Sequence, residues 1–301
     1  MALNLKNKIF RNLKDVELAS VIYLTGISLY ILLFIPRIEH ALELIVIHLI
    51  LIAIIFVTAF YRTRKLQAAN GFILLTYPVL FLAFLYRETD SINNVFFQNL
   101  DSYLSHWESI IFHAQPSLLF HKMIPQTWFS ELMNFGYFSF YLVIIVYLLY
   151  IYYRNREQAE KQTFLVIVAF YLYYIIFIIF PTAGPQFYFS TGLQSSEGPG
   201  VFKALVCMAQ RIGEGETGAF PSSHVGMTSI ILFQSFRFSK KLFWCLLPVA
   251  LLLFSSTVYI QAHFLIDVVA GIFTFPLFLA TSDLLYNLLQ YSRKTYQETG
   301  K

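Results

Sequence analysis

Long apolar segments separated by polar connections run along the chain from about residue 18. Apolar runs of about 18 or more residues predict membrane-spanning helices, because a helix of that length crosses the hydrocarbon core of a bilayer. The pattern predicts eight such segments, of which the third and the sixth are short. They are 18–36, 41–60, 72–86, 133–153, 162–180, 222–236, 242–260 and 264–288. We therefore expect an all-α fold, a polytopic helical bundle in a membrane.

The composition agrees with this prediction. Of the 301 residues, 57% are hydrophobic and 13% are charged, whereas soluble domains have about 25% charged residues. The mean hydropathy is +0.63. The first apolar segment follows a basic N-terminus, as in a signal peptide. It runs from about Leu18 to Ile35, however, which is longer than a signal peptide requires, and no small-residue cleavage site follows it. We interpret it as the first spanning helix.

Positive side chains are distributed unevenly between the two sides of the predicted bundle. Eight spans place both termini on one side, and sixteen of the 21 Lys and Arg residues fall on that side. Cytoplasmic loops carry an excess of Lys and Arg, so we expect both termini to be cytoplasmic. The long connections 87–132 and 181–221 then lie on the outer side, which is periplasmic in a bacterium and lumenal or extracellular in a eukaryote.

The connection 87–132 mixes aromatic and polar residues, among them Tyr103, Trp107 and Trp128. Tyr and Trp are enriched at the membrane–water interface, so this mixture indicates a helix that lies in the interface. Two interpretations remain open. The connection is either a packed cap over the bundle or a gate through which a lipid enters.

Cys207 and Cys245 are too few for a disulfide framework and too far apart in the predicted topology to pair. No clustered Cys and His spacing indicates a metal, and we expect no cofactor. The net charge of +4 is a weak argument for an anionic partner, and we expect no nucleic-acid partner.

Residues 218–226 combine polar side chains with a predicted helix start. Pro221 suits a first helical turn, the hydroxyl of Ser222 or Ser223 can cap the helix, and the free amides of that turn bind anions. His224 would then lie beside a bound phosphate, where it can give a proton to a leaving oxygen.

A second polar segment, residues 256–267, precedes the last apolar run. His263 and Asp267 are four residues apart and face the same way on a helix. A carboxylate that accepts a hydrogen bond from one imidazole nitrogen leaves the other nitrogen free to attack. A single buried histidine is as compatible with a structural role as with a catalytic one. Two histidines, a capped turn and a carboxylate together favour a catalytic site.

The two segments resemble the type 2 phosphatidic acid phosphatase superfamily, whose members are metal-independent membrane phosphatases and phosphotransferases with a helical-bundle core. Residues 221–224 match its second motif, P-S-x-H. Ser256, His263 and Asp267 match the third motif, S-R-x5-H-x3-D, with Thr257 where arginine is usual. The resemblance implies a six-helix core within the eight expected spans.

The first motif of the superfamily, K-x6-R-P, has an altered counterpart here. Residues 180–188 contain neither the lysine nor the arginine, and they carry Pro181 and Pro185. A P-x-x-x-P first motif, an A-F-P-S-x-H second motif and the missing arginine also characterise the branch that includes fungal inositol phosphorylceramide synthase. Residues 99–140 are similar to that branch, so the resemblance covers about 99–275.

This extent implies three parts of the chain. Residues 1–90 hold N-terminal transmembrane helices, of which the first two look like an addition to the family core. Residues 91–290 form a membrane-embedded lipid phosphatase or phosphotransferase core, and residues 291–301 form a cytoplasmic tail.

The resemblance also implies roles for individual residues. His263 is expected to be the nucleophile that forms a phosphohistidine, Asp267 to orient its ring, and His224 to protonate the leaving group. Ser222, Ser223 and nearby backbone amides are expected to bind the phosphate oxygens.

The missing motif cations have to be replaced, because phosphoryl transfer depends mainly on positioning and electrostatics. Arg211 and Lys203 precede the second motif and are the available replacements. Arg211 is the preferred candidate, with a solvated loop cation as the alternative interpretation. Gln186 can donate a neutral hydrogen bond.

These residues predict a phosphatase that acts on lipid phosphates or phospholipids at the outer membrane face. The first alternative is a phosphotransferase that moves a headgroup such as phosphoinositol onto a ceramide-like hydroxyl, which would place the chain in sphingolipid metabolism. The second alternative is a non-catalytic lipid transporter or scaffold, which the missing cations suggest.

Overall fold

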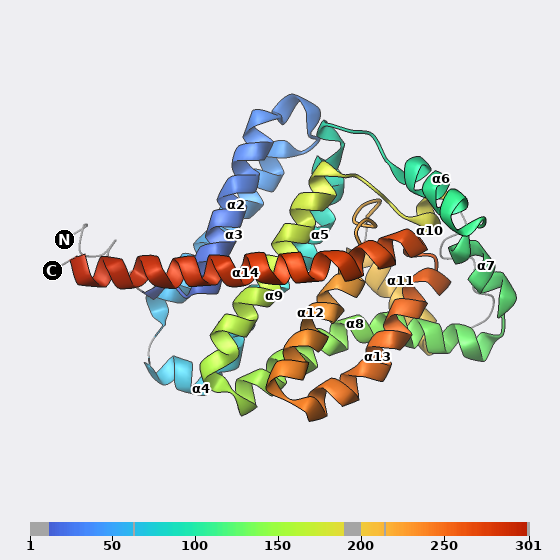
Figure 1. Cartoon of the computed structure of the whole chain (residues 1–301). Helices are drawn as coiled ribbons and strands as arrows, with labels where there is room; N and C mark the ends of the chain where they lie inside the picture. Colours follow the sequence, from blue (N-terminus) through green and yellow to red (C-terminus); the bar gives the residue numbers. More distant parts are fainter. Residues whose placement is uncertain (1–11, 63, 190–199, 214, 300–301) are drawn as a thin grey trace. The chain divides into compact units, whose positions relative to one another are not determined.

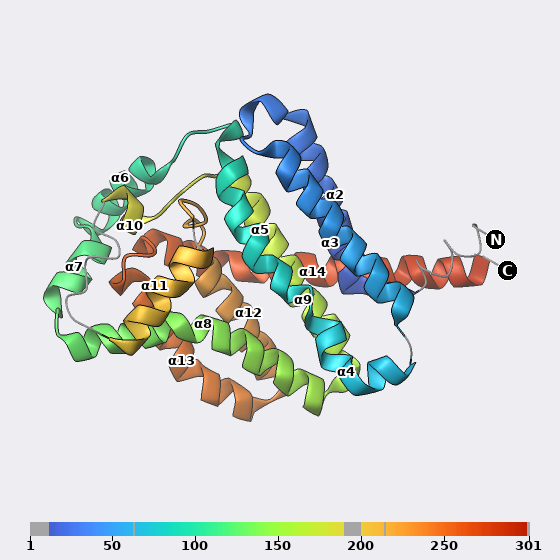
Figure 2. The ribbon, with the colours of Figure 1, turned by 180° about the vertical axis from the view of Figure 1, so that it is seen from behind.

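The computed structural model describes residues 12–62, 64–189, 200–213 and 215–299. Every regular element in these ranges is helical, which confirms the expected all-α fold for this part of the chain (Figures 1 and 2). The helices are α2 (Asp15–Leu33), η1 (Ile35–Arg37), α3 (Ala41–Tyr61), α4 (Arg64–Thr76), α5 (Val79–Ile92), η2 (Asn93–Val95), α6 (Asp101–Phe112), α7 (Pro116–Met123), α8 (Thr127–Arg154), α9 (Arg156–Ile179), α10 (Pro185–Tyr188), α11 (Val201–Gly213), α12 (Ser223–Phe238), α13 (Lys240–Tyr259) and α14 (Leu265–Thr299).

Seven helical segments in these ranges are long and apolar enough to cross a membrane, which confirms a multi-pass integral membrane protein. They are α2, α3, the segment Asn70–Val95, α8, α9, α13 and Leu265–Thr295 of α14. The expected third span is divided into α4 and α5 just before Val79. The preceding residue, Pro78, has no backbone N–H to give to a continuous helix.

The segment expected as the sixth span is α12, which has only 16 residues, compared with about 17–25 in a typical spanning helix. Most of its side chains are buried, including the polar side chains of Thr228, Ser229 and Gln234. A helix surrounded by protein does not need an apolar outer surface. This explains why the apolar pattern is short and interrupted at α12.

The chain forms two compact units. The first unit comprises residues 1–84, 148–171 and 279–301, and the second comprises residues 85–147 and 172–278. Several long helices contribute to both units, because α8, α9 and α14 each continue past a boundary between them.

In the first unit, α2 and α3 pack side by side (Figures 1 and 2). The buried carboxylate of Glu17 is paired with Arg62 and accepts a hydrogen bond from the hydroxyl of Tyr77 at 2.9 Å. The rings of Tyr23 and Tyr171 stack with centroids 4.1 Å apart. These contacts join α2 to three other segments of the same unit.

In the second unit, α8, α12 and α13 pack together, and two glycines allow their backbones to approach closely. A Cβ on Gly136 of α8 would lie 2.8 Å from a side-chain carbon of Leu252 on α13. A Cβ on Gly226 of α12 would collide with the hydroxyl of Tyr173 on α9. A larger residue at either position would separate the helices that carry the polar motifs.

The connection 87–132 contains two short helices, α6 and α7, at the end of the second unit where α10 also lies (Figures 1 and 2). On α6, the side chains of Tyr103 and Trp107 are 64% and 53% exposed. Asp101 and Glu108 on the same helix are buried. α6 therefore exposes aromatic side chains and buries carboxylates, the opposite of a surface helix in a soluble protein.

Candidate active site

The N-terminus of α12 is capped as the sequence predicts. The Ser222 hydroxyl accepts a hydrogen bond from the backbone N–H of Val225 at 3.4 Å. Pro221 lies outside the first turn, because the cap is Ser222 and the helix begins at Ser223. The N–H of Ser222 donates to the backbone carbonyl of Asp267 at 3.0 Å. This bond ties the start of α12 to the first turn of α14.

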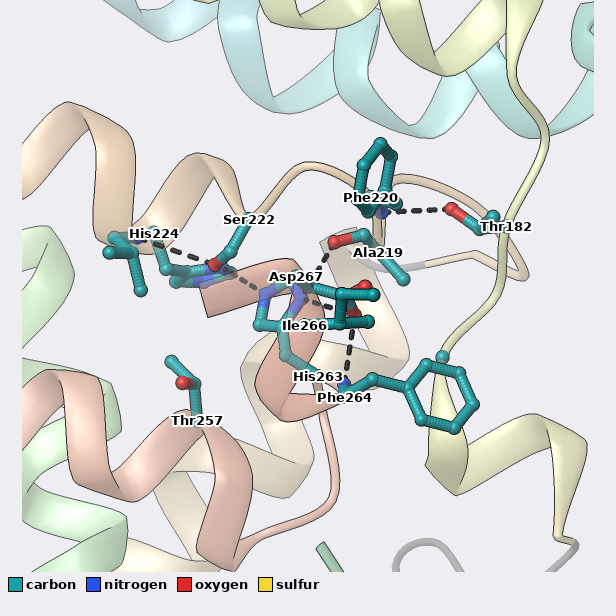
Figure 3. A network of polar contacts seen from close by, with 12 residues as sticks. Thr182, Ala219, Phe220, Ser222, His224, Thr257, His263, Phe264, Ile266 and Asp267 are labelled. Carbon is teal, nitrogen blue, oxygen red and sulfur yellow. Dashed lines mark hydrogen bonds and ion pairs between the residues drawn. The ribbon is translucent and has the colours of Figure 1, made fainter. Parts of the chain in front are cut away.

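The structure brings His224 and His263 into direct contact (Figure 3). His224 lies in the first turn of α12, and His263 lies in the short connection between α13 and α14. His224 Nδ1 is 3.2 Å from His263 Nε2. The ring centroids are 5.4 Å apart and the rings are inclined by 66°. Both side chains are buried, with exposed fractions of 7% and 3%.

The hydrogen bonds of His263 define its tautomer. His263 Nδ1 is 2.9 Å from the carbonyl oxygen of Ala219. A carbonyl oxygen can only accept, so Nδ1 carries the hydrogen and Nε2 carries a lone pair. His224 Nδ1 must then be the donor in the hydrogen bond between the two rings. The backbone turn that contains Ala219 thus orients the histidine, a role that side-chain motifs do not reveal.

Asp267 lies near His263, but the two do not share the helix that their spacing predicts, because His263 precedes the start of α14. Asp267 acts mainly on the backbone. Its Oδ2 is 3.6 Å from His263 Nδ1, which is within ion-pair range but longer than a hydrogen bond. The same oxygen accepts the N–H of Phe264 at 2.8 Å. The carboxylate therefore fixes the turn between His263 and α14, and the nearer acceptor for the imidazole is Ala219.

Two aromatic rings from α8 hold His224 in place. The ring of Tyr137 is 4.6 Å from the imidazole between centroids, and the ring of Phe140 is 4.3 Å from it. These two residues lie three apart and share a helical face. Neither residue belongs to a sequence motif. Their spacing is a weak signal, because α8 carries aromatic residues along much of its length.

The loop that corresponds to the first motif is hydrogen-bonded to the segments of the other two motifs, through backbone groups and the Thr182 hydroxyl. Phe220 N–H donates to the hydroxyl of Thr182 at 2.8 Å, and Ala219 N–H donates to the carbonyl of Thr182 at 3.1 Å. Gly184 has φ +94°, and a Cβ there would lie 2.5 Å from the carbonyl oxygen of Ala262. Gln186 N–H donates to the carbonyl of Gln261 at 2.8 Å.

Two buried carboxylates of α6 bind the loops around the histidines. Asp101 Oδ2 accepts the N–H of Ala183 at 2.8 Å, and its Oδ1 accepts the N–H of Gly184 at 3.1 Å. Burial raises the pKa of the Asp101 carboxyl, and these two hydrogen bonds oppose the rise. Glu108 Oε1 accepts the N–H of Leu265 at 2.6 Å. Burial raises the pKa of Glu108 to about 7. The sequence motifs indicate neither residue.

The predicted phosphate-binding residues differ in their surroundings. Ser222 and Ser223 lie at the N-terminus of α12, beside His224. Gln186 lies on α10, and its side-chain oxygen accepts a hydrogen bond from Gln210 at 3.0 Å. Arg211 lies near the end of α11 with an exposed side chain. The hydrogen bonds and ion pairs of the described residues do not join its guanidinium to the histidine pair.

Cys207 and Cys245 are free thiols, as the sequence predicts. Among the described residues, no group of three or more His, Cys, Asp or Glu side chains could hold a metal ion.

Comparison with known families gave one match. The family model described as PAP2 superfamily matches residues 102–281, a range that contains α6 from its second residue and both histidines. No curated protein sequence matches the chain, and no solved structure matches it.

Proposed function

Because this chain belongs to the PAP2 superfamily, we propose that it is a membrane-embedded phosphatase that acts on lipid phosphates through a phosphohistidine. Members of the superfamily are generally phosphatases or phosphotransferases. The excess of Lys and Arg on one side of the chain favours an outer-face site with both termini in the cytoplasm. The observation that carries the proposal is the hydrogen bond between His224 and His263.

His263 has the features of a nucleophile. Its Nδ1–H is engaged with the Ala219 carbonyl, so the Nε2 lone pair points away from that carbonyl and toward His224. An imidazole held in one tautomer by a hydrogen bond on the other nitrogen presents a defined nucleophilic atom. Burial excludes water, which would otherwise weaken the electrostatic interactions with a bound phosphate.

The reaction has two steps. In the first step, His263 Nε2 attacks phosphorus while the bond from phosphorus to the ester oxygen breaks. A protonated His224 gives its Nδ1 proton to that oxygen, which leaves as a lipid alcohol. In the second step, neutral His224 takes a proton from water as the water oxygen attacks phosphorus. Inorganic phosphate leaves, and both histidines return to their starting states.

Substrate binding must separate the two rings. At 3.2 Å, His224 Nδ1 and His263 Nε2 are in hydrogen-bond contact and leave no room for phosphorus between them. The proton that His224 shares with His263 at rest is then available for the leaving oxygen. The resting hydrogen bond therefore keeps the acid and the nucleophile aligned until a phosphate replaces it.

The start of α12 is the proposed phosphate site. The free N–H groups of a first helical turn bind anions, and Ser222 and Ser223 can add hydroxyl donors. Gln186 lies on the loop that is hydrogen-bonded to Gln261, two residues before His263, and is our neutral donor. Arg211 is our candidate for the missing motif cation, which requires its exposed side chain to turn toward the substrate.

The direct test is phosphate release from a panel of lipid phosphates by the purified protein in lipid–detergent micelles. We expect the His263→Ala and His224→Ala variants to lose at least about 10³-fold in kcat, because each removes a reacting group. His106→Ala is the matched control, since His106 is exposed on α6, and it should keep wild-type activity. If neither wild type nor His263→Ala releases phosphate or transfers it to a lipid hydroxyl over the whole panel, a non-catalytic lipid transporter or scaffold becomes the better proposal.

A phosphotransferase is the second candidate, and the burial of His263 favours it. A phosphohistidine that water reaches poorly survives until a lipid hydroxyl attacks it. The P-x-x-x-P loop and the A-F-P-S-x-H segment also resemble the inositol phosphorylceramide synthase branch. The proposed acceptor is therefore a ceramide-like alcohol, and the transferred group is a phospho-headgroup such as phosphoinositol.

Acceptor competition distinguishes the two reactions. The protein would be given either a labelled lipid phosphate monoester or a labelled inositol phospholipid, each with increasing ceramide, and free phosphate and labelled product lipid would be measured together. A transferase forms labelled lipid in proportion to ceramide and releases little phosphate. A phosphatase releases phosphate at a rate that ceramide does not change.

A further inference from the structure

Beyond the two histidines, we propose that Glu108 is a positioning residue for the reaction, because its carboxylate clamps the first turn of α14, between His263 and Asp267. This inference rests on the proposed function. Glu108 lies far from both residues in the sequence, on a helix that carries none of the three motifs. It touches the backbone of α14, so it acts through that backbone on the side chains beside it.

Hydrogen bonds hold every backbone N–H of the segment that joins the two residues. His263 N–H donates to the carbonyl of Thr257 at 3.0 Å, and Phe264 N–H donates to Asp267. The next two N–H groups, of Leu265 and Ile266, both donate to Glu108 Oε1, at 2.6 and 3.4 Å. The first N–H groups of a helix have no partner within the helix. Glu108 supplies one from α6.

The Glu108 side chain is fully buried. Its second oxygen, Oε2, makes no hydrogen bond among the described residues. Burial raises the pKa of Glu108 to about 7, the Leu265 N–H opposes the rise, and the charge of Asp267 adds to it. A carboxylate in this environment is a poor choice for stability alone, because burying a charge without full compensation is unfavourable. We therefore assign it the role of holding the first turn of α14 in place.

The distribution of buried side chains on α6 is consistent with this role. Its buried face carries Asp101 and Glu108, which are seven residues apart and therefore on the same side of the helix. Asp101 binds the first-motif loop and Glu108 binds α14. One helix thus fixes two segments of the site, while Tyr103 and Trp107 remain exposed on it.

Three variants separate positioning from general stability. Glu108→Ala removes the acceptor, whereas Glu108→Gln keeps an acceptor oxygen of similar reach. Glu17→Ala is the matched control, because Glu17 is also a buried glutamate whose carboxylate accepts a backbone N–H, that of Lys14 at 2.8 Å. Glu17 lies on α2 in the first unit, which contains none of the proposed site residues.

We expect Glu108→Ala to lower kcat by about 10–100-fold with little change in KM, because small misplacements of reacting groups carry penalties of this order. Glu108→Gln should retain at least about a third of wild-type kcat, and Glu17→Ala should stay within about twofold. Thermal unfolding of each purified variant shows whether it is folded. An equal fall in kcat for Glu108→Ala and Glu17→Ala would overturn the proposal.

Hydrogen exchange measured by mass spectrometry provides a second readout that needs no activity. Amides 264–266 should exchange faster in Glu108→Ala than in wild type, and should stay protected in Glu108→Gln and Glu17→Ala. Unchanged protection in Glu108→Ala would overturn the clamp even if the enzyme proposal holds. Amides 264–266 could exchange faster in Glu108→Ala while the wild-type protein neither hydrolyses nor transfers lipid phosphate. That result would uphold the clamp and reject the proposed function.

Discussion

The groups that surround Nδ1 of His263 and define its tautomer include a backbone carbonyl as well as a side chain. Ala219 contributes a carbonyl at 2.9 Å from Nδ1, and Asp267 lies at 3.6 Å. The sequence indicates both histidines and the aspartate through their spacing and types. It cannot indicate a carbonyl, since every residue has one, and it cannot relate Glu108 to Leu265 across more than 150 positions. These contacts depend on how the helices pack.

This geometry leads to a prediction for Asp267→Asn. In a triad whose aspartate is the only partner of the imidazole, the same change costs about 10⁴-fold in kcat through the wrong tautomer. Here the Ala219 carbonyl still selects Nδ1–H. We therefore expect a loss of about 10–100-fold in kcat, from the altered turn and the lost charge. Steady-state kinetics measures this, and a loss comparable to that of His263→Ala would mean that Asp267 alone controls the tautomer.

Helices with continuous apolar runs can be predicted from the sequence. Helical segments that also carry polar residues, and that contact both apolar and charged groups, are harder to predict. The expected span 242–260 corresponds closely to α13. α14 extends to Thr299, well beyond the expected end at residue 288. Its polar continuation is stabilised in the first unit by Arg293, whose Nε lies 2.8 Å from an oxygen of Asp15. An apolar pattern cannot reveal a helix that is held by such a pair.

The Glu108 carboxylate on α6 leads to a prediction about the pH dependence of stability. The pKa of Glu108 is raised from 4.5 to about 7. A carboxyl group with a raised pKa in the folded state stabilises the fold fully below its unfolded pKa, and this contribution is lost as the pH rises through about 7. Glutamine does not titrate. The Tm of Glu108→Gln minus that of wild type should therefore increase between about pH 5 and pH 8.

Calorimetry or tryptophan fluorescence in the same detergent would measure both proteins at each pH. Titrating groups that do not interact with Glu108 are common to the two proteins and cancel in the difference. Asp267, whose charge raises the pKa of Glu108, interacts with it and is part of the measured effect. A Tm difference that is constant over this pH range, or that decreases, would show that Glu108 does not titrate between its unfolded pKa and neutrality.

The whole chain combines a family core with additional helices. The family match covers residues 102–281, and α2 and α3 lie before it. The distribution of Lys and Arg predicts the orientation, although some of these cations fall within residues 1–11, which lie outside the described residues. Composition and hydropathy are sufficient to predict a multi-pass protein. They do not predict two units that share helices, because that division depends on contacts between segments far apart in the chain.

Orientation can be tested by labelling single cysteines in intact cells. With Cys207 and Cys245 replaced by serine, a cysteine at Asn94 should react with a membrane-impermeant maleimide. A cysteine at Lys301 should react only after the cells are permeabilised. The opposite pattern would place the proposed site on the cytoplasmic face and contradict the positive-inside argument.

The central claim is that His263 receives the phosphoryl group while His224 handles the proton. The most direct measurement is rapid quenching of the protein with ³²P-labelled lipid phosphate, followed by mapping of the labelled peptide. We predict a label on His263 that is stable to alkali and lost in acid, and that is absent from His263→Ala. A labelled serine, or a label that persists in His263→Ala, would contradict it.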